Sequence, residues 1–231
     1  MIEQFDGLKS NIDGIIHSPF LSSKECCDCI EYAHKKEEEL KKLNIEYKST
    51  YGKNKITTNL YTQYNFFNDN PQHLKKLEKI IYPLFNNIEY YPITIQSWVN
   101  IYRKNDNIQW HTHNATNQIP SFGYTANIFL CGNEDIGLTY AIHDKKMPRY
   151  HYKHIKNKLG HIMIFPNHIY HMVRKNSYDE IRYTVGMTIT AYNSHLGRLW
   201  ASNSRSQDFI GLTLPHTNST EINQELKINY Q

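Results

Sequence analysis

The sequence lacks the long apolar runs that membrane-spanning helices require. Of its 231 residues 39% are hydrophobic, and no segment approaches the roughly 18 consecutive apolar residues that indicate a span. The first residues, MIEQFDGLKSNIDG, also lack the basic segment followed by an apolar one that is typical of a secretion signal. These absences predict an intracellular protein with no membrane segment.

Cysteine is scarce, and its spacing excludes the common cross-linked folds. Three of the four cysteines crowd into the segment ECCDC, and the fourth is Cys131. This spacing fits neither a disulfide framework nor a zinc ribbon. Cys26 and Cys29 can share the buried face of one helix, so we interpret them as core residues. A redox or metal-binding role is the alternative.

Neither charge nor repetition divides the chain into distinct parts. Lys and Arg exceed Asp and Glu by 26 to 22, a net charge of +4, but the two signs are scattered and often alternate. Composition therefore permits an acidic partner without indicating nucleic acid. No internal repeat is visible at a period of about 20 to 50 residues. Because β and barrel domains often reach this length, we expect one domain over residues 1–231.

Residues 1–91 carry two amphipathic helical patterns, which we interpret as support for a β core. The first pattern runs from Phe20 to Leu43 and begins with a Ser-x-x-Glu capping box. The second opens at Pro71, a residue preorganised for the first turn of a helix, and places its apolar residues on one side. Between them, residues 60–67 (LYTQYNFF) have the composition of a strand.

From residue 92 to residue 192 the pattern changes to short β-branched and aromatic segments. Gly, Asn, Asp and Pro separate five of them, namely ITIQSWVNIY, FGYTANIFL, IGLTYAI, GHIMIF and IRYTVGMTITAY. Strands at this spacing predict a sandwich or barrel, and hence an α+β chain that is mainly β. Residues 193–231 are polar, and we expect a loop-rich C-terminal extension there.

Thirteen histidines are present, so position must separate metal ligands from ordinary residues. His111 and His113 follow the strand that holds Tyr102, and residues two apart in an extended segment point to the same side. Two imidazoles at one strand end can coordinate a metal ion together. His171, which follows an apolar strand and a turn, is the best candidate for a third ligand from a distant strand. A surface or structural role is the simpler interpretation of the other histidines.

Arg182 stands beside a nearly apolar strand, where an unpaired guanidinium would be costly to bury. A buried arginine there needs an anion, and a dicarboxylate co-substrate can supply one through a bidentate contact. Strand alternation turns Tyr102 and Asn127 toward the interior, where each could hydrogen-bond the co-substrate; core packing is the alternative. The basic and aromatic stretch 143–158 could line a substrate groove, but a solvated hairpin connection is the simpler interpretation.

Together these segments resemble the prolyl-4-hydroxylase-like branch of the 2-oxoglutarate- and Fe(II)-dependent dioxygenases, including oxygenases of that class from phages and marine bacteria. The order and spacing of five elements carry the resemblance. They are the helix FLSSKECCDCIEYA, Tyr102 with His-x-His nine residues later, YTANIFLCGNEDIGLTYAI, GHIMIFPNHIYH with the distal histidine, and Arg182-Tyr183-Thr184. The match covers roughly residues 20 to 192.

The resemblance implies a double-stranded β-helix, a jelly-roll or cupin-like barrel with the N-terminal helices packed on one sheet. It implies His111 and His171 as Fe(II) ligands, and Arg182 and Thr184 as residues that bind 2-oxoglutarate. The expected reaction consumes dioxygen, hydroxylates a peptidyl-proline or another peptide, protein or small-molecule substrate, and releases succinate and carbon dioxide. The alternative is a non-catalytic cupin-like module that captures a metal or ligand. We expect a cytoplasmic enzyme of a bacterium or a phage-infected host.

The chain departs from the family pattern at His113, where the family has Asp or Glu two residues after the first histidine. A neutral imidazole makes the metal centre one unit more positive than the usual set of two histidines and one carboxylate. Three-histidine iron sites are chemically possible, and we expect His113 to be a ligand. The alternative is that His113 points elsewhere and that water or a remote carboxylate takes its place.

Overall fold

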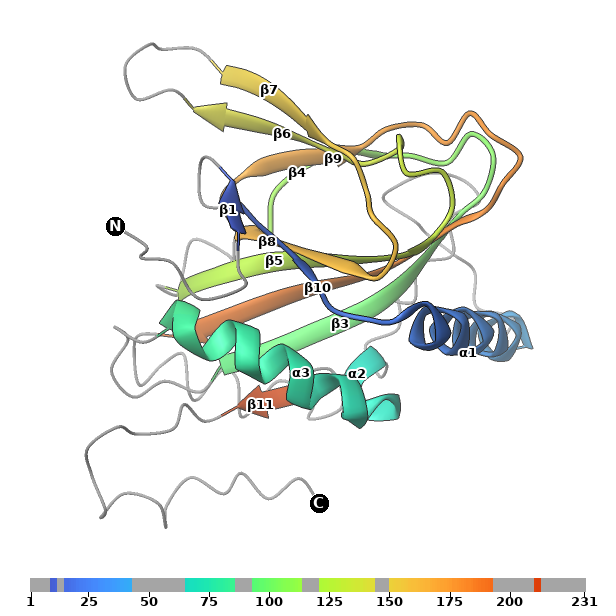
Figure 1. Cartoon of the computed structure of the whole chain (residues 1–231), viewed down its shortest axis with the longest axis horizontal. Coiled ribbons are helices and arrows are strands. Elements are labelled where there is room, and N and C mark those ends of the chain that lie inside the picture. Colours follow the sequence, from blue (N-terminus) through green and yellow to red (C-terminus); the bar gives the residue numbers. More distant parts are fainter. Residues whose placement is uncertain are drawn as a thin grey trace.

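Two antiparallel β-sheets form the body of the molecule in the computed structural model, and helices lie along one of them (Figure 1). The structure describes residues 9–11, 15–42, 65–85, 93–113, 121–143, 150–192 and 210–212. Within these ranges strands outnumber helices. The expectation of a mainly β chain with few helices is therefore confirmed.

The larger sheet has seven described strands in the spatial order β1-β2-β8-β5-β10-β3-β11, and each neighbouring pair is antiparallel. Their bounds are β1 (Lys9–Asn11), β2 (Ile15–Pro19), β8 (His161–Pro166), β5 (Ser121–Cys131), β10 (Arg182–Tyr192), β3 (Ile93–Tyr102) and β11 (Ile210–Leu212). The long central strands β8, β5, β10 and β3 match segments predicted from the sequence. By contrast, β1, β2 and β11 lie in the parts expected to be helical support and loop extension.

The smaller sheet has four described strands in the order β4-β9-β6-β7. Their bounds are β4 (Ile108–His111), β9 (Tyr170–Val173), β6 (Leu138–His143) and β7 (Tyr150–Ile155). Two of them correct the sequence interpretation. β4 does not continue the strand that ends at Tyr102, because a turn at Asn105, whose φ is 73°, carries the chain from one sheet to the other. The stretch 143–158, interpreted as a connection, contains β7, which pairs with β6.

The helices begin where the sequence carries helix-start signals. Their bounds are α1 (Ser23–Lys42), α2 (Phe66–Asp69) and α3 (Pro71–Ile81), and a 3-10 turn (Tyr82–Phe85) follows α3. The capping box before α1 is formed, because the Ser22 backbone N–H donates to the Glu25 carboxylate at 2.8 Å and the Glu25 N–H donates to the Ser22 hydroxyl at 3.3 Å. Pro71 is at the start of α3, where its missing N–H costs nothing.

The short helix α2 corrects the strand expected over residues 60–67. Phe66 and Phe67 are helical because Asn65 caps the helix: its side-chain oxygen accepts a hydrogen bond from the Phe67 N–H at 3.2 Å. Asn65 also donates to the Ile95 carbonyl at 2.7 Å, which ties the cap to β3. Residues 60–64 lie outside the described ranges.

One face of the larger sheet packs against the helices and holds the main apolar core (Figure 1). Alternate residues of β10, namely Val185, Met187 and Ile189, point to this face and are fully buried. Cys26 and Cys29 of α1 lie in the same core with 1% exposure each, and both thiols are free. The expected core-packing role of these two cysteines is confirmed.

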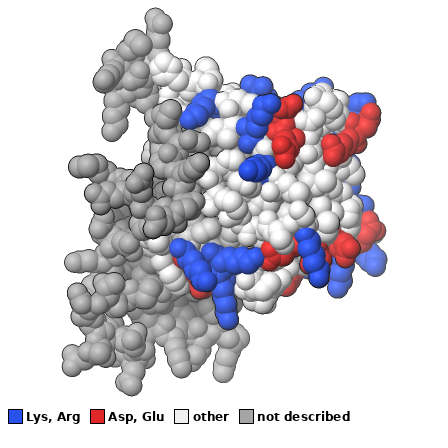
Figure 2. Space-filling view, in the orientation of Figure 1, with Lys and Arg blue, Asp and Glu red and all other residues white. Residues whose placement is uncertain are grey.

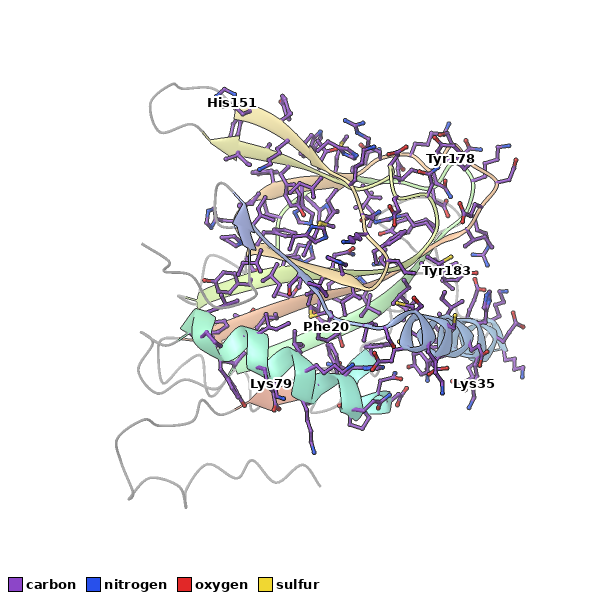
Figure 3. The ribbon with its side chains drawn as sticks, in the orientation of Figure 1. Phe20, Lys35, Lys79, His151, Tyr178 and Tyr183 are labelled. Carbon is purple, nitrogen blue, oxygen red and sulfur yellow. The ribbon has the colours of Figure 1, made fainter. Side chains whose placement is uncertain are left out.

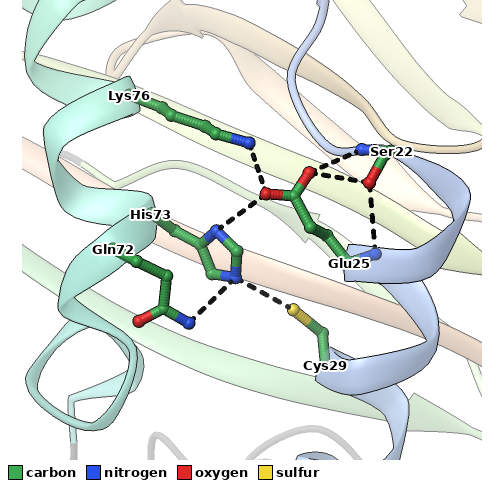
Figure 4. A network of polar contacts seen from close by, with 6 residues as sticks. All are labelled: Ser22, Glu25, Cys29, Gln72, His73 and Lys76. Carbon is green, nitrogen blue, oxygen red and sulfur yellow. Dashed lines mark hydrogen bonds and ion pairs between the residues drawn. The ribbon is translucent and has the colours of Figure 1, made fainter.

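A polar network joins α1 to α3 (Figure 4). The Cys29 sulfur lies 3.7 Å from His73 Nε2, the other nitrogen of that ring lies 3.9 Å from a Glu25 oxygen, and Lys76 pairs with the same carboxylate. A cysteine, a histidine and a glutamate in series resemble an activated nucleophile. Burial, however, raises the pKa of the Cys29 thiol to about 12 and lowers that of His73. The thiol stays protonated, so the network links two helices rather than supporting catalysis.

The surface charges intermingle as the sequence suggests. On the face shown in Figure 2, basic side chains lie beside acidic ones in several places, and Lys36 pairs with Glu39 and Lys41 with Glu38 on the solvated side of α1. None of the described helices has the length and apolar character needed to cross a bilayer.

Candidate metal centre and buried arginine

Three histidines converge on one point between the two sheets. His111 of β4 and His171 of β9 are direct partners in the strand ladder, and His113 lies two residues beyond the end of β4. One nitrogen of each ring lies within 4.8 Å of the others. The ring centres are 4.2 Å apart for His111 and His171, and His113 is 5.1 and 5.2 Å from them. The three histidines singled out from the sequence therefore come together.

Two of the three imidazoles are oriented by backbone carbonyls close in sequence. Nδ1 of His111 lies 2.8 Å from the Gln109 carbonyl oxygen, and Nδ1 of His171 lies 3.0 Å from the Ile169 carbonyl oxygen. A carbonyl can only accept, so Nδ1 carries the proton in both rings and Nε2 keeps its lone pair. This is the arrangement in which histidines usually bind metal ions.

His113 is fixed by residues of the larger sheet and by a loop. Its Nδ1 lies 2.9 Å from the hydroxyl oxygen of Thr188, and its backbone N–H donates to the Asn167 carbonyl at 3.0 Å. The indole of Trp98 stacks on the His113 ring with the centres 5.9 Å apart and the planes 12° apart. His113 thus points into the cluster, and no described Asp or Glu joins the group. Among the described residues nothing supports a remote carboxylate as the third ligand.

Burial keeps the three imidazoles neutral. It lowers the pKa of His111, of His113 and, to about 3, of His171, and the neighbouring rings lower the last two further. Neutral imidazole is the form that binds a metal, and it suits iron, zinc, copper and nickel. The donor set is therefore ready for a transition metal at neutral pH.

The other described histidines lie away from this cluster. His168, three residues before His171, is exposed, and His151 is exposed on β7 near the periphery of the molecule (Figure 3). His154 contacts the Asp135 carbonyl at 2.8 Å. Their surface or structural interpretation agrees with these positions.

A second unusual feature is Arg182, which is completely buried at the start of β10. None of its three nitrogens has a partner at hydrogen-bonding geometry among the described residues. The ring of Tyr102 lies against the guanidinium, with its centre 4.6 Å from Cζ. Burial lowers the pKa of this arginine, and the Tyr102 contact opposes that change. A buried guanidinium without a well-placed hydrogen-bond acceptor among the described residues is costly, so its surroundings suit an anion.

One face of β10 connects Arg182 to the metal cluster. Its residues on that face, in order, are Arg182, Thr184, Gly186 and Thr188. Arg182 lies opposite Tyr102 in the ladder, and Thr188 contacts His113. Successive residues on one face of a strand are about 7 Å apart. The arginine and the histidines therefore bound one interior region from two ends.

Asparagine side chains face the region between the two ends. Asn100 of β3 donates from its amide nitrogen to the Thr184 hydroxyl at 3.2 Å, and Asn127 of β5 lies opposite Gly186. Both asparagines are buried, and the side-chain oxygen of each lacks a hydrogen-bond partner among the described residues. Buried polar groups normally have a hydrogen-bond partner, so these two oxygens leave polar capacity for a ligand or an ordered water.

Several residues of this interior were not among the sequence candidates. Tyr140 of β6 is fully buried with its ring centre 6.4 Å from that of His171, and Trp98, Asn100 and Thr188 complete the set. The alternation of residues along a strand predicts that three of them face the same interior as the candidates. Asn100 and Trp98 are two and four residues before Tyr102, and Thr188 has the same parity as Arg182 and Thr184 on β10.

Comparison with known proteins gives matches in structure only. Neither a scan against protein-family models nor a search of curated proteins matches this sequence. A prolyl-4-hydroxylase from Pseudomonas putida superposes with a TM-score of 0.52 at 12% identity, over 80% of this chain and 94% of the other. The viral collagen prolyl hydroxylase of Paramecium Bursaria Chlorella virus-1, solved as its 2OG complex, has a TM-score of 0.51 at 18% identity, over 78% and 97%.

A third similar structure is the epimerase SnoN in complex with Fe3+, alpha ketoglutarate and nogalamycin RO. Its TM-score is 0.55 at 14% identity, over 90% of this chain and 88% of the other. At such identities the likeness concerns the fold. The resemblance to prolyl-4-hydroxylases and other 2-oxoglutarate-dependent oxygenases that the motifs indicated is confirmed at that level.

Proposed function

We propose that this protein is an oxygenase that uses Fe(II), 2-oxoglutarate and dioxygen within a double-stranded β-helix. The observation that carries the proposal is the pairing of a three-imidazole cluster with a fully buried, unpartnered Arg182 at the other end of the same interior. A metal-capturing module without catalysis has no evident need for such an arginine. The oxygenase is therefore favoured over the cupin-like binding module.

His111, His113 and His171 would hold the metal through Nε2, because Nδ1 of each ring is occupied by another contact. Three ligands on one side leave room for a chelating oxoacid and for dioxygen. With Fe(II) bound, the site would couple decarboxylation of 2-oxoglutarate to succinate and carbon dioxide with transfer of one oxygen atom to a substrate C–H bond.

Arg182 would bind the distal carboxylate of 2-oxoglutarate through a bidentate contact, since its planar fork matches a carboxylate and has no other described partner. The Tyr102 ring against the guanidinium fixes the plane of that fork. Thr184, next on the same face of β10, can donate its hydroxyl proton to the same carboxylate. These contacts would orient the co-substrate with its keto end toward the histidines.

Asn127 and Asn100 would contribute the remaining polar contacts. Their unpartnered oxygens cannot pair with a carboxylate, which only accepts hydrogen bonds. A half-turn of the Asn127 amide would direct its NH2 group to the ligand instead. Asn100 keeps its NH2 group on the Thr184 hydroxyl oxygen at 3.2 Å, which leaves the Thr184 proton free for the carboxylate.

For the substrate we propose a peptidyl-proline, as in the two similar prolyl hydroxylases, with a small molecule as the second candidate, as in SnoN. Fold similarity supports this choice, and it does not determine a substrate. We also propose that residues 1–231 form one cytoplasmic domain. Support comes from β2 and β11, near the two ends of the chain, which pair with the long strands β8 and β3.

Succinate formation tests the oxygenase assignment against the binding module. The protein is incubated aerobically with Fe(II) and 2-oxoglutarate, alone and with proline-containing peptides or a pool of small metabolites. We expect succinate that requires the metal, and a substrate that gains the mass of one oxygen atom. Binding of metal and oxoacid without succinate in any mixture would favour the binding module instead.

A further inference from the structure

His113 is held in a different way from the two histidines beside it. His111 and His171 are oriented by carbonyls two residues earlier in their own segments, so any folded β4 and β9 would orient them. His113 depends instead on two side chains of the larger sheet, the Thr188 hydroxyl at 2.9 Å and the stacked indole of Trp98. Its orientation can therefore be changed without altering the backbone that carries it.

Trp98 can stack on His113 because residue 186 has no side chain. Gly186 lies directly opposite Trp98 in the ladder between β10 and β3. A Cβ built on it would lie 2.9 Å from Nε1 of the indole, closer than real Cβ atoms come, and 3.0 Å from Cε2 and 3.2 Å from Asn100 Nδ2, which is tighter than nine in ten real contacts. The glycine thus makes the space in which the indole lies flat against the His113 ring.

These contacts suit an imidazole and do not suit the carboxylate that the family pattern has at this position. A carboxylate has no ring face to stack on Trp98, and it could only accept the Thr188 O–H, whereas a neutral imidazole can donate its Nδ1 proton to that oxygen. We infer that Thr188 and Trp98 are positioning residues that make His113 the third metal ligand, and that Gly186 admits Trp98 to this role. The inference rests on the proposed metal site and is independent of the proposed reaction.

Thr188 acts through the tautomer of His113. When its hydroxyl oxygen accepts the Nδ1 proton, Nε2 keeps the lone pair and faces the cluster. The Thr188 hydroxyl can also donate to Nδ1, which would place the proton on Nε2. Both tautomers of His113 are therefore allowed until a metal binds Nε2. The other two rings have no such choice, because carbonyl oxygens only accept. Losing a contact of this kind typically lowers metal affinity about 10- to 100-fold.

The first experiment titrates the full-length protein with Co(II) alone and follows its visible absorption, which needs no co-substrate and no turnover. Thr188→Val keeps the shape of the side chain and removes the hydroxyl, so we expect affinity to fall about 10-fold or more. Thr188→Ser keeps the hydroxyl and should bind within a few-fold of wild type. In the Zn(II) form, nitrogen NMR should show His113 protonated at Nδ1 in wild type and in Thr188→Ser.

The second experiment is a double-mutant cycle on Trp98 and Gly186, with circular dichroism as the check on folding. Gly186→Ala should displace the indole and weaken Co(II) binding about 10-fold. In a Trp98→Phe background the smaller ring removes the close contact, so the same Gly186→Ala change should cost much less. Non-additivity of this sign in the Co(II) affinity of variants that circular dichroism shows to be folded supports the inference, and additive losses of affinity overturn it.

The outcomes separate the inference from the proposed function. If wild type binds Co(II) and both Thr188→Val and Gly186→Ala bind it equally well, Thr188 and Trp98 do not position His113 and the inference is overturned. If wild type itself binds no Co(II), the metal site fails, and the inference and the proposed function fail together. If the variants behave as expected but succinate never forms, the inference stands and the oxygenase reaction is wrong.

Discussion

Alternate residues of the same strands make the two faces of the larger sheet, yet the faces differ in chemistry. On β10 the face toward the helices carries Val185, Met187 and Ile189, whereas the face toward the smaller sheet carries Arg182, Thr184, Gly186 and Thr188. The first set packs without polar atoms. The second set lies opposite Tyr102 and Asn100 of β3 and Asn127 of β5. One strand therefore supplies both an apolar core and the wall of a candidate site.

Unmet hydrogen bonds are concentrated on the face toward the smaller sheet, the inner face. The face toward the helices is the outer face. Nine buried side-chain nitrogen and oxygen atoms lack a partner among the described residues, and five of them belong to Arg182, Asn100 and Asn127. A face that only stabilised the fold would satisfy or exclude such groups. The comparison teaches that the outer face supplies stability while the inner face keeps polar groups ready for ligands, at a cost in stability. Substitutions on the two faces should therefore have opposite signatures.

The largest expected effect is on metal binding at the inner face. His171→Ala removes the ring that lies directly opposite His111 in the ladder, so we expect loss of measurable Fe(II) binding and of metal-dependent succinate formation. His168→Ala is the matched control, because His168 is exposed three residues away. Equal metal binding by the two variants, measured by equilibrium dialysis, would place the site elsewhere.

A sharper test separates binding from stability at Arg182. Arg182→Met should weaken 2-oxoglutarate binding roughly thirtyfold or more, because losing a desolvated charge partner costs about 2–5 kcal/mol. Without co-substrate the same variant should unfold no more easily than wild type, since it removes a buried guanidinium that has no described partner. Calorimetry and urea unfolding measure the two quantities. Unchanged affinity for 2-oxoglutarate would refute the role of Arg182 in anion binding. A large drop in the unfolding free energy would show that Arg182 also stabilises the fold.

The outer face should show the reverse signature. Ile189→Ala leaves a cavity at a fully buried position, and such changes cost about 2–5 kcal/mol of unfolding free energy. Metal affinity of the folded protein should stay close to that of wild type. Urea unfolding and Co(II) titration check the two expectations. If affinity falls along with stability, the two faces are not independent.

The smallest expected effect concerns acid sensitivity in the helical layer. Hydrogen bonds from Lys76 and Ser22 lower the pKa of Glu25 to about 2, against an ordinary value of 4.5. The unfolded chain binds this proton more readily, so the carboxylate's contribution is complete above about pH 4.5 and is lost as pH falls toward 2. Because the pair is partly exposed, its size should be below about 1 kcal/mol. In Glu25→Gln the unfolding free energy should therefore change less with pH between about pH 5 and pH 3 than it does in wild type. An equal pH dependence in the two proteins, measured by urea unfolding, would contradict this.

Much of the framework follows from local pattern. The segments of β3, β5, β8 and β10 are long and rich in β-branched residues, so composition alone identifies them. The two helix starts follow from a capping box and a proline. The strand β1 has three residues and pairs with its neighbour β2, whereas β2 and the three-residue β11 also pair with strands far along the chain, β8 and β3. Such pairings leave little trace in a single sequence.

Part of the site could also be predicted from local sequence pattern. The order of motifs pointed to His111, His113, His171 and Arg182, and the structure brings the histidines together with the arginine at the other end of one interior. The role of Thr188 could not be read from sequence, because its contact with His113 joins residues 75 positions apart. Such a contact depends on how one sheet faces the other.

The central claim is that the inner face binds a metal and a 2-oxoacid together. The most direct test is an anaerobic titration of the protein with Fe(II) and 2-oxoglutarate, followed by visible absorption. We predict a weak metal-to-ligand charge-transfer band that needs both ligands and that Arg182→Met does not show at the same concentrations. No band in wild type, or an equal band in Arg182→Met, would contradict the account.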